Sequence, residues 1–300
     1  MIHTMLKSLR FLRLRQVAGV LAIATLVACS GGSGCGNCNV PVFVPGSGTP
    51  GPVLPTPIPT PAPLSCNQNT TAPNAIVLGP ALAPFALLAG STITNVGNTF
   101  VTYTGATHDD LVGVSPGTAV TGFYPPGTVA DGPSSIYAAT FNTNAAVPLA
   151  AESALTTAYN TAAGKASTAT VAGDLGGQTL PPGVYTSTST LAIASGNLTL
   201  DGGGNPQSIF IFQIASTLTT VLNGAAGGNV LLQNGASACN IYWQVGSSAT
   251  LGGATFNGNV LALASITINA TTFNGRALAR TAAVSIPVIS GSLITNPGGS

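Results

Sequence analysis

The sequence predicts a mainly β protein, a β-solenoid of triangular cross-section with one long α-helix packed alongside. The first observation is a repeat between Gly183 and Gly291, in which an apolar-alternating strand, a hydroxyl-rich strand and a Gly or Asn corner recur. Its clearest copies begin at Ser248 and Ser265, 17 residues apart. At roughly 3.3 Å per residue, this period accommodates three short strands and three corners in each coil. The second observation is a single segment with clear helical spacing, residues 148–163.

Residues 1–28 are predicted to be an export signal of the lipoprotein type. Basic residues precede position 16, and a short apolar run from Val17 to Ala28 follows, too short for an ordinary transmembrane helix. The run ends in Leu26-Val-Ala-Cys29, which resembles the bacterial lipobox, so we expect lipid modification of Cys29 and attachment to a membrane. The alternative is an ordinary cleavage site with an incidental cysteine. We expect an outer-membrane or cell-surface lipoprotein, or a secreted protein.

Residues 29–65 are predicted to be a linker that begins with the lipidated cysteine. Gly and Ser give way to a Pro-rich stretch between Gly51 and Pro63, which favours extended, semi-rigid conformations. The folded domain is then expected at residues 66–300. Cys66 and Cys239 offer a disulfide between the start of this domain and one coil, but the sequence does not establish the pairing.

Within the domain, residues 83–94 have the pattern of a strand, a corner and a strand, and residues 100–104 that of another strand. The helix at residues 148–163 has Pro148 at a plausible first position and Gly164 where it would end. One face of this helix carries Ala151, Leu155, Ala158, Tyr159 and Ala162. We therefore expect the helix to cover one apolar side of the solenoid.

The repeat predicts a flat, hydroxyl-rich face, because neighbouring side chains in a strand point to opposite sides. We expect a core column of Leu191, Leu218, Leu251, Ile268 and Ile286. The outward residues beside it form the candidate binding face: Thr188, Thr190, Thr217, Thr219, Ser248, Thr250, Ser265, Thr267 and Ser285. One strand further along, a second candidate face contains Thr255, Asn257, Thr272 and Asn274. Thr and Ser also favour solvated strands in general, but a solvated strand normally carries Lys and Glu, which are absent here.

Composition excludes several classes of function. Charged residues make up 4% of the chain, against roughly 25% in typical domains. After the signal, three basic residues (Lys165, Arg276 and Arg280) remain against six acidic ones, so no basic patch is available to bind nucleic acid. So few carboxylates also predict no metal site, no cofactor and no acid–base catalysis. A Gly-x-Ser-x-Gly match at Ser115 lacks the backbone donor of a hydrolase, because Pro116 follows the serine.

Several longer motifs resemble those of the microbial ice-binding proteins. They are Val114-Ser-Pro-Gly-Thr-Ala-Val-Thr-Gly-Phe123, Val171-Ala-Gly-Asp-Leu-Gly-Gly-Gln-Thr-Leu-Pro-Pro-Gly-Val-Tyr185, Ile209-Phe-Ile-Phe-Gln213, Cys239-Asn-Ile-Tyr-Trp-Gln-Val-Gly-Ser-Ser-Ala-Thr-Leu-Gly252 and Asn274-Gly-Arg-Ala-Leu-Ala-Arg280. The resemblance implies a right-handed solenoid with discontinuous coil order, in which coils before and after the helix stack on one another. It also implies a partner, the ice crystal surface, bound through one flat face without catalytic residues. Tyr124 and residues 130–144 depart from the family pattern.

The sequence thus favours a non-enzymatic, monomeric protein that adsorbs to ice. Adsorption would give thermal hysteresis, inhibition of recrystallisation or adhesion to ice at the cell surface. The alternative is a cell-surface adhesin or glycan-binding solenoid without ice activity, which exposed aromatic side chains in a groove would favour. A polysaccharide lyase or hydrolase is a third class, and it requires clustered charged residues that the sequence does not supply.

Overall fold

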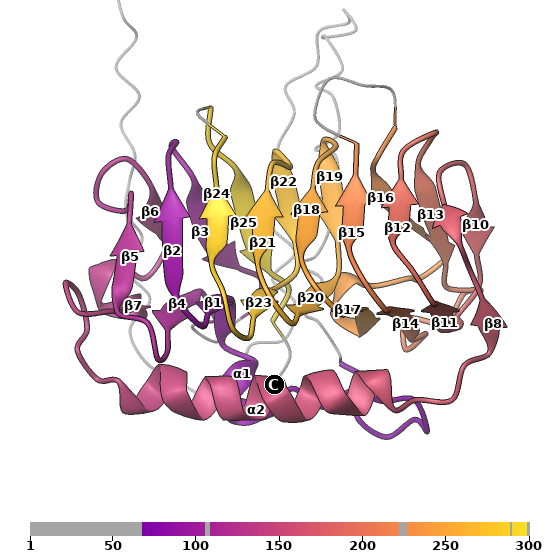
Figure 1. The fold of residues 1–300 in the computed structure, drawn as a ribbon, viewed down its shortest axis with the longest axis horizontal. Helices are drawn as coiled ribbons and strands as arrows, with labels where there is room; N and C mark the ends of the chain where they lie inside the picture. Colours follow the sequence, from indigo (N-terminus) through magenta and orange to yellow (C-terminus); the bar gives the residue numbers. More distant parts are fainter. Residues whose placement is uncertain (1–67, 106–108, 222–226, 289, 299–300) are drawn as a thin grey trace, which may run out of the picture. The chain divides into compact units, whose positions relative to one another are not determined.

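The computed structural model describes residues 68–105, 109–221, 227–288 and 290–298. They form a solenoid with three sides and one long helix beneath it (Figure 1). Sheet A has the strand order β7 (Ile136–Tyr137), β4 (Leu111–Val114), β1 (Phe85–Ala89), β23 (Ala277–Ala279), β20 (Asn259–Ala262), β17 (Ile241–Val245), β14 (Phe210–Ile214), β11 (Gly183–Ser187) and β8 (Ala169–Thr170). The mainly β solenoid with a flanking helix is therefore confirmed.

Sheet B, which faces the viewer in Figure 1, is an unbroken sheet of eight strands. Its order is β5 (Ala119–Thr121), β2 (Thr92–Asn95), β24 (Val284–Ile286), β21 (Ile266–Ile268), β18 (Ala249–Leu251), β15 (Leu218–Thr220), β12 (Leu191–Ile193) and β9 (Gly173–Asp174). All of its described pairs are parallel, as expected where each coil stacks on the next.

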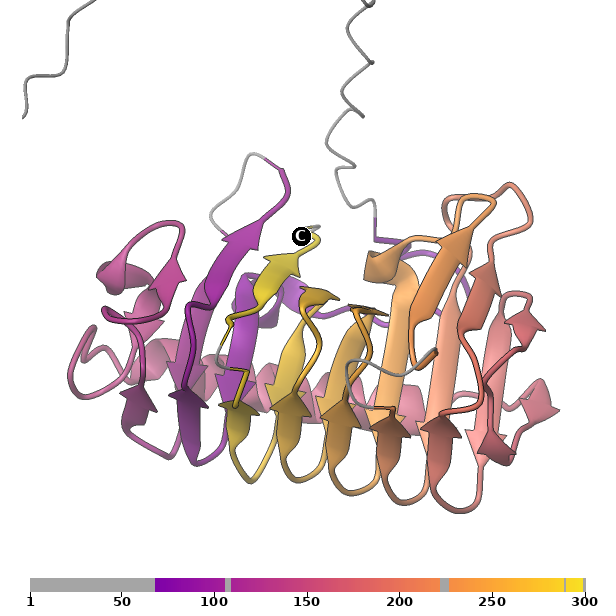
Figure 2. The same cartoon turned by 90° about the horizontal axis from the view of Figure 1, so that it is seen from above.

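The third side is divided into two sheets. Sheet C contains β19 (Thr255–Asn257), β22 (Thr272–Asn274), β25 (Leu293–Asn296), β3 (Phe100–Tyr103) and β6 (Thr128–Val129). Sheet D contains β10 (Thr179–Leu180), β13 (Leu198–Asp201) and β16 (Val230–Gln233). β16 and β19 are not paired by a backbone ladder. At this gap, Asn229 Oδ1 accepts hydrogen bonds from the N–H groups of Ala254 and Thr255. Figure 2 shows sheet B as one even row of strands, whereas the strands of the third side diverge.

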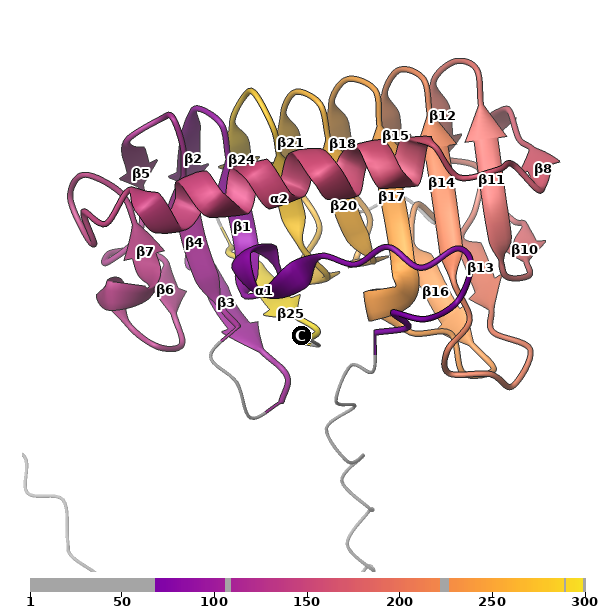
Figure 3. The ribbon, with the colours of Figure 1, turned by 90° about the horizontal axis from the view of Figure 1, so that it is seen from below.

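The coil order is discontinuous, as the family resemblance implied. Strands β1, β2 and β3, which precede the helix, pair with β23, β24 and β25 from the end of the chain. Helix α2 (Ala146–Ala163) runs the length of sheet A, and the chain after it resumes at the far end with β8 (Figures 1 and 3). The second half of the chain then winds back coil by coil until it meets the first half.

Helix α2 buries the face that the sequence predicted: Ala151, Leu155, Ala158, Tyr159 and Ala162, together with Pro148. It begins two residues before Pro148, and Gly164 is its C-cap. At and just beyond its C-terminus, the side-chain amide of Gln213 donates to the carbonyl oxygens of Ala162, Ala163 and Lys165. A four-residue helix, α1 (Gly79–Leu82), lies on the same side of sheet A (Figure 3).

The core inside the solenoid contains a stack of aromatic rings that the sequence analysis did not predict. It runs through Tyr185, Phe212 and Trp243 on neighbouring strands of sheet A and continues through Phe256 and Phe273 on neighbouring strands of sheet C. Phe212 and Trp243 are closest, with ring centroids 4.0 Å apart and planes 10° apart. Trp243 is fully buried and donates from Nε1 to the carbonyl oxygen of Asn257.

The end of the solenoid beside β5, β6 and β7 is closed by residues 122–145, which include the 3₁₀ turn η1 (Pro133–Ser135). Phe123, Val129 and Ile136 from this segment are part of the inner core. The Tyr124 hydroxyl accepts a hydrogen bond from the N–H of Val129 and donates one to its carbonyl oxygen. Tyr124, a departure from the family pattern, thus satisfies backbone groups at the edge strand β6.

Residues 68–78 form a strap across sheet A (Figure 3). Asn69 N–H donates to Asn240 Oδ1 in the 3₁₀ turn η2 (Ala238–Asn240), and the Tyr242 hydroxyl donates to the carbonyl oxygen of Ile76. Cys239 is disulfide-bonded. Cys66, its partner candidate from the sequence, lies outside the described residues, as do the predicted signal and linker.

Candidate functional site

Sheet B is the side of the solenoid that is both exposed and continuous. Sheet A is covered by α2 and the strap, and the third side is interrupted between β16 and β19. In each central strand of sheet B, the middle residue points outward between two buried ones: Thr219, Thr250, Thr267 and Ser285. Eight strands at about 4.8 Å spacing make a face roughly 34 Å long.

The ladder register sorts the outward residues into two columns. Column 1 has the order Ala119, Thr92, Ala283, Ser265, Ser248, Thr217 and Thr190, one residue before the paired core positions. Column 2 has the order Thr121, Thr94, Ser285, Thr267, Thr250, Thr219, Ala192 and Asp174. Both columns consist of small side chains, and every residue but Asp174 is neutral.

The structure corrects the predicted alignment of the columns by two residues. Thr190 and Thr217 align with Ser248 and Ser265, not with Thr250 and Thr267, and Thr188 lies in the corner between β11 and β12, outside both columns. The core column changes accordingly, because Leu191 and Leu218 align with Ala249, Ile266 and Val284 and not with Leu251, Ile268 and Ile286.

The cause of this error is a hydroxyl in the core. The Thr220 side chain points inward and is 1% exposed, and its Oγ1 accepts a hydrogen bond from the Gly252 N–H. Leu218 and Thr220 are the two inward residues of β15. If residue 220 were aliphatic, the alternation of apolar and polar residues in β15 would have been visible in the sequence. Ala249, the true partner of Leu218, is small and only weakly hydrophobic, so the prediction aligned Leu218 with the next large apolar residue, Leu251.

The first half of the chain contributes Thr92, Thr94 and Thr121, which the sequence prediction missed. The alternation Thr92-Ile93-Thr94 was visible, but nothing local showed that this strand joins the repeats from the end of the chain. With these residues, the hydroxyl-bearing face extends across both halves of the sequence.

Hydrogen bonds along the columns orient some of the hydroxyl groups. Ser265 Oγ donates to Ser248 Oγ at 2.9 Å, and Ser285 Oγ donates to Thr267 Oγ1 at 3.1 Å. The two bonds link successive strands on the outward surface. Together with the stiff χ1 of β-branched Thr, they restrict the positions that these oxygens can occupy.

Asp174 ends column 2, and its charge is directed into the backbone. Its carboxylate accepts hydrogen bonds from the N–H groups of Gly176, Ala194 and Ser195. These bonds, first that from Ala194, lower the pKa of Asp174 to about 2. The carboxylate therefore stays ionised at neutral pH and serves as an end cap of the sheet.

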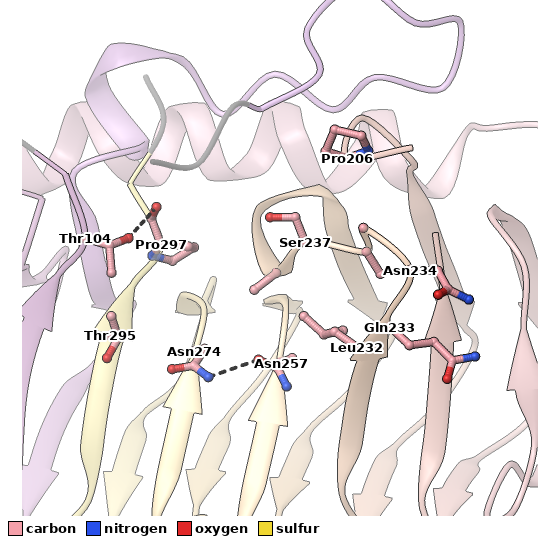
Figure 4. Close-up of a pocket in the computed structure, with 13 residues that line it drawn as sticks. Thr104, Pro206, Leu232, Gln233, Asn234, Ser237, Asn257, Asn274, Thr295 and Pro297 are labelled. Carbon is pink, nitrogen blue, oxygen red and sulfur yellow. Dashed lines mark hydrogen bonds between the residues drawn. The ribbon is translucent and has the colours of Figure 1, made fainter. Parts of the chain in front are cut away.

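The second candidate face has the predicted register but is not a flat surface. Thr255 pairs with Thr272, and Asn257 with Asn274. Asn257 is only 6% exposed and donates to the Val230 carbonyl oxygen, while Asn274 Nδ2 donates to Asn257 Oδ1 (Figure 4). Both line a groove of about 520 Å³ that also includes Leu232 of β16. Phe100 and Leu293 share the column of Thr272 and are 43% and 42% exposed.

Titratable groups with shifted pKa values lie away from the two columns, apart from Asp174. Burial raises the pKa of Glu152 on α2 to about 8, which the positive charge of Arg280 partly offsets. The Arg280 guanidinium lies 4.8 Å from the centroid of the Tyr159 ring. Among the described residues, no group of three His, Cys, Asp or Glu side chains is placed to hold a metal ion. No described helix is long and apolar enough to cross a membrane.

Comparison with known proteins places this architecture in a family. Residues 87–289 match the family model described as Ice-binding-like. An ice-binding protein of Nostoc sp. (strain HG1) is 41% identical over 204 residues, which cover 67% of this chain and 67% of that protein. One from Leucosporidium sp. (strain AY30) is 35% identical over 182 residues, 59% of this chain and 62% of that protein.

Solved structures agree. An ice-binding protein from an Antarctic biological consortium superimposes with a TM-score of 0.62 and 43% identity, over 73% of this chain and 90% of that one. An ice-binding protein from an Arctic yeast, whose structure was described as the basis of its antifreeze activity, gives a TM-score of 0.61 and 30% identity, over 74% and 94% of the two chains. From its motifs, its discontinuous solenoid and these similarities, we conclude that the chain belongs to the ice-binding-like family.

Proposed function

We propose that this protein binds ice by adsorption of sheet B, through columns 1 and 2. The observation that carries the proposal is the continuity of this face. Eight strands present short Thr, Ser and Ala side chains in register, and the one charged member, Asp174, is bonded to backbone N–H groups. The relatives' activity as ice-binding proteins supports the same function, and it does not favour the glycan-binding alternative.

The physical basis is a rigid surface that water can cover in an ordered layer. Each hydroxyl exchanges a hydrogen bond with water for one with ice, so a single bond contributes little, about 0.5–1.5 kcal/mol at most. Selectivity for ice over liquid water must therefore come from many groups held at fixed spacing. Parallel ladders fix the spacing across the strands, and the buried core below, from Leu218 to Val284, keeps the sheet from bending.

The test is the growth of single ice crystals in solutions of the mature chain. We expect faceted crystals and a gap between the melting and freezing temperatures. Thr250→Tyr and Thr267→Tyr place a bulky ring in the middle of column 2 and should abolish this gap while the melting temperature of the protein is unchanged. Thr255→Tyr on sheet C is the matched control and should leave activity intact. Full activity of both column 2 variants would refute sheet B as the ice-binding face.

We further propose that the domain acts at the cell exterior, anchored through Cys29 or secreted, as a monomer without enzymatic activity. The support is the signal-like N-terminus and the lipobox-like Leu26-Val-Ala-Cys29. Expression with an alkyne-labelled fatty acid tests the anchor: we expect labelled protein in the membrane fraction, and loss of the label in Cys29→Ser. An unlabelled, membrane-free protein would favour secretion. Light scattering after gel filtration tests the monomer.

A further inference from the structure

We infer that the ice-binding face has a third, uncharged column, in which Val96 and Pro287 are exposed apolar members. The inference rests on the proposed function, because it extends the same surface. Neither residue follows the Thr and Ser pattern of the repeat, and both lie just beyond the ends of their strands, β2 and β24.

The backbone shows that the sheet continues to this column. The Val96 N–H donates to the Ile286 carbonyl oxygen at 3.0 Å, which continues the ladder between Asn95 and Ile286 by one residue. In β2 the outward residues are Thr92 and Thr94, and Ile93 and Asn95 are buried, so alternation turns Val96 outward on the same side. Val96 is 51% exposed. Pro287 follows Ser285 and buried Ile286 in the same way and is exposed.

Further along the sheet, the third column continues with uncharged residues that have short side chains: Asn269, Gly252, Val221 and Ala194. The Asn269 N–H donates to the Leu251 carbonyl oxygen, and the Val221 N–H donates to that of Ile193. Gly252 and Ala194 occupy the equivalent places after β18 and β12. These four residues include no Lys, Arg, Asp or Glu, and none has a side chain longer than that of Asn.

Shape explains why an apolar column can belong to this face. Val has the outline of Thr with a methyl group in place of the hydroxyl, so Val96 should stand at the height of Thr94. Methyl groups hold water less strongly than charged groups do, and covering them with ordered water or ice carries no penalty for lost hydrogen bonds. Neighbouring columns are about 6.7 Å apart, because they are two residues apart along each strand. Adding the third column to columns 1 and 2 therefore doubles the width of the surface that contacts ice.

Two other exposed aliphatic side chains, which lie away from sheet B, serve as controls. Leu149 is 61% exposed on the outer surface of α2, away from sheet B. Leu231 is 39% exposed on β16 of sheet D. If exposed apolar side chains acted non-specifically, changes at these positions would affect ice growth as much as changes at Val96.

The experiment measures thermal hysteresis of the full mature chain carrying Val96→Tyr or Val96→Asp, at matched concentrations. Tyr adds height, and Asp keeps a small size but adds a hydrated charge. We expect each variant to retain less than half of the wild-type activity with an unchanged melting temperature of the protein, while Leu149→Tyr and Leu149→Asp retain all of it. Full activity in either Val96 variant would overturn the third column.

The Thr250→Tyr variant separates this result from the proposed function itself. If Thr250→Tyr abolishes activity and the Val96 variants keep it, sheet B binds ice but its contact area ends at column 2. If Thr250→Tyr also keeps full activity, sheet B is not the ice-binding face, and the third column falls with it.

Discussion

Arg276 provides the sharpest test of how the two halves of the chain are held together. Its side chain is fully buried, next to strand β23 at the seam between the halves. Nε donates to the Ala83 carbonyl oxygen, Nη1 to Asn259 Oδ1 and Nη2 to the Gly298 carbonyl oxygen. Burial lowers its pKa to about 10, so the guanidinium remains charged at neutral pH. We predict that Arg276→Met strongly destabilises the domain.

The magnitude follows from the acceptors that the substitution leaves behind. Ala83 O keeps a partner, because the Asn296 side-chain amide also donates to it. Gly298 O and Asn259 Oδ1 lose theirs, and each buried unsatisfied acceptor costs about 1–3 kcal/mol. Asp109, whose charge acts on Arg276, loses its counter-charge as well. We expect a loss of about 3–5 kcal/mol, the range for a broken buried ionic contact.

Thermal unfolding followed by circular dichroism measures this loss. For a domain of this size, 1 kcal/mol shifts the melting temperature by about 2–4 °C, so we expect a decrease of about 6–20 °C. Arg280→Met is the matched control, because Arg280 is only partly buried, with a 3.3 Å hydrogen bond to Thr156 Oγ1 and the Tyr159 ring contact. A decrease for Arg276→Met no larger than that for Arg280→Met would refute the reasoning.

Three further substitutions test particular hydrogen bonds and charges. Glu152 has a folded pKa of about 8 against 4.5 unfolded, so the folded state holds this proton more tightly, and stability should fall as pH rises from about 4.5 to 8. Glu152→Gln should remove most of this fall and raise stability at pH 8 by about 1–2 kcal/mol, since solvent screens the partly exposed carboxyl; identical pH profiles of melting temperature would contradict it. Thr220→Val leaves the Gly252 N–H unpaired and should cost about 1–3 kcal/mol in urea unfolding, and a neutral result would mean that another acceptor replaces the hydroxyl. Tyr124→Phe removes both hydrogen bonds to Val129, so the amide hydrogen of Val129 should exchange faster with solvent. An unchanged exchange rate of this hydrogen would show that the Tyr124 hydroxyl does not protect the edge of β6.

The sequence predicted the elements that depend on local periodicity. The buried face of α2 was correct at all five positions, because helical spacing alone decides which residues share a face. The pairing of Thr255 with Thr272 and of Asn257 with Asn274 was also correct, because these two coils have the same length.

What the sequence did not predict depends on contacts between distant segments. The two-residue error in the columns arose because Thr220 is polar yet buried, and only its bond to Gly252 explains that place. Thr92, Thr94 and Val96 were missed because β2 pairs with β24, far away in the sequence. The groove beside Asn257 depends on corner geometry, which residue types alone do not specify.

The discontinuous coil order also affects how the protein is made. During synthesis, β1, β2 and β3 leave the ribosome first, but the strands that complete them, β23, β24 and β25, are translated last. Until then, the early coils present open strand edges on one side, the arrangement that favours pairing with other chains. In a solenoid with continuous coil order, each new coil pairs with the one made just before it, so no early strand waits for the end of the chain. Here the α2 helix covers one side of these first coils and residues 122–145 close one end, but the edge that awaits β23, β24 and β25 stays open. A truncated product that lacks the last coil should therefore aggregate rather than fold as a shorter solenoid.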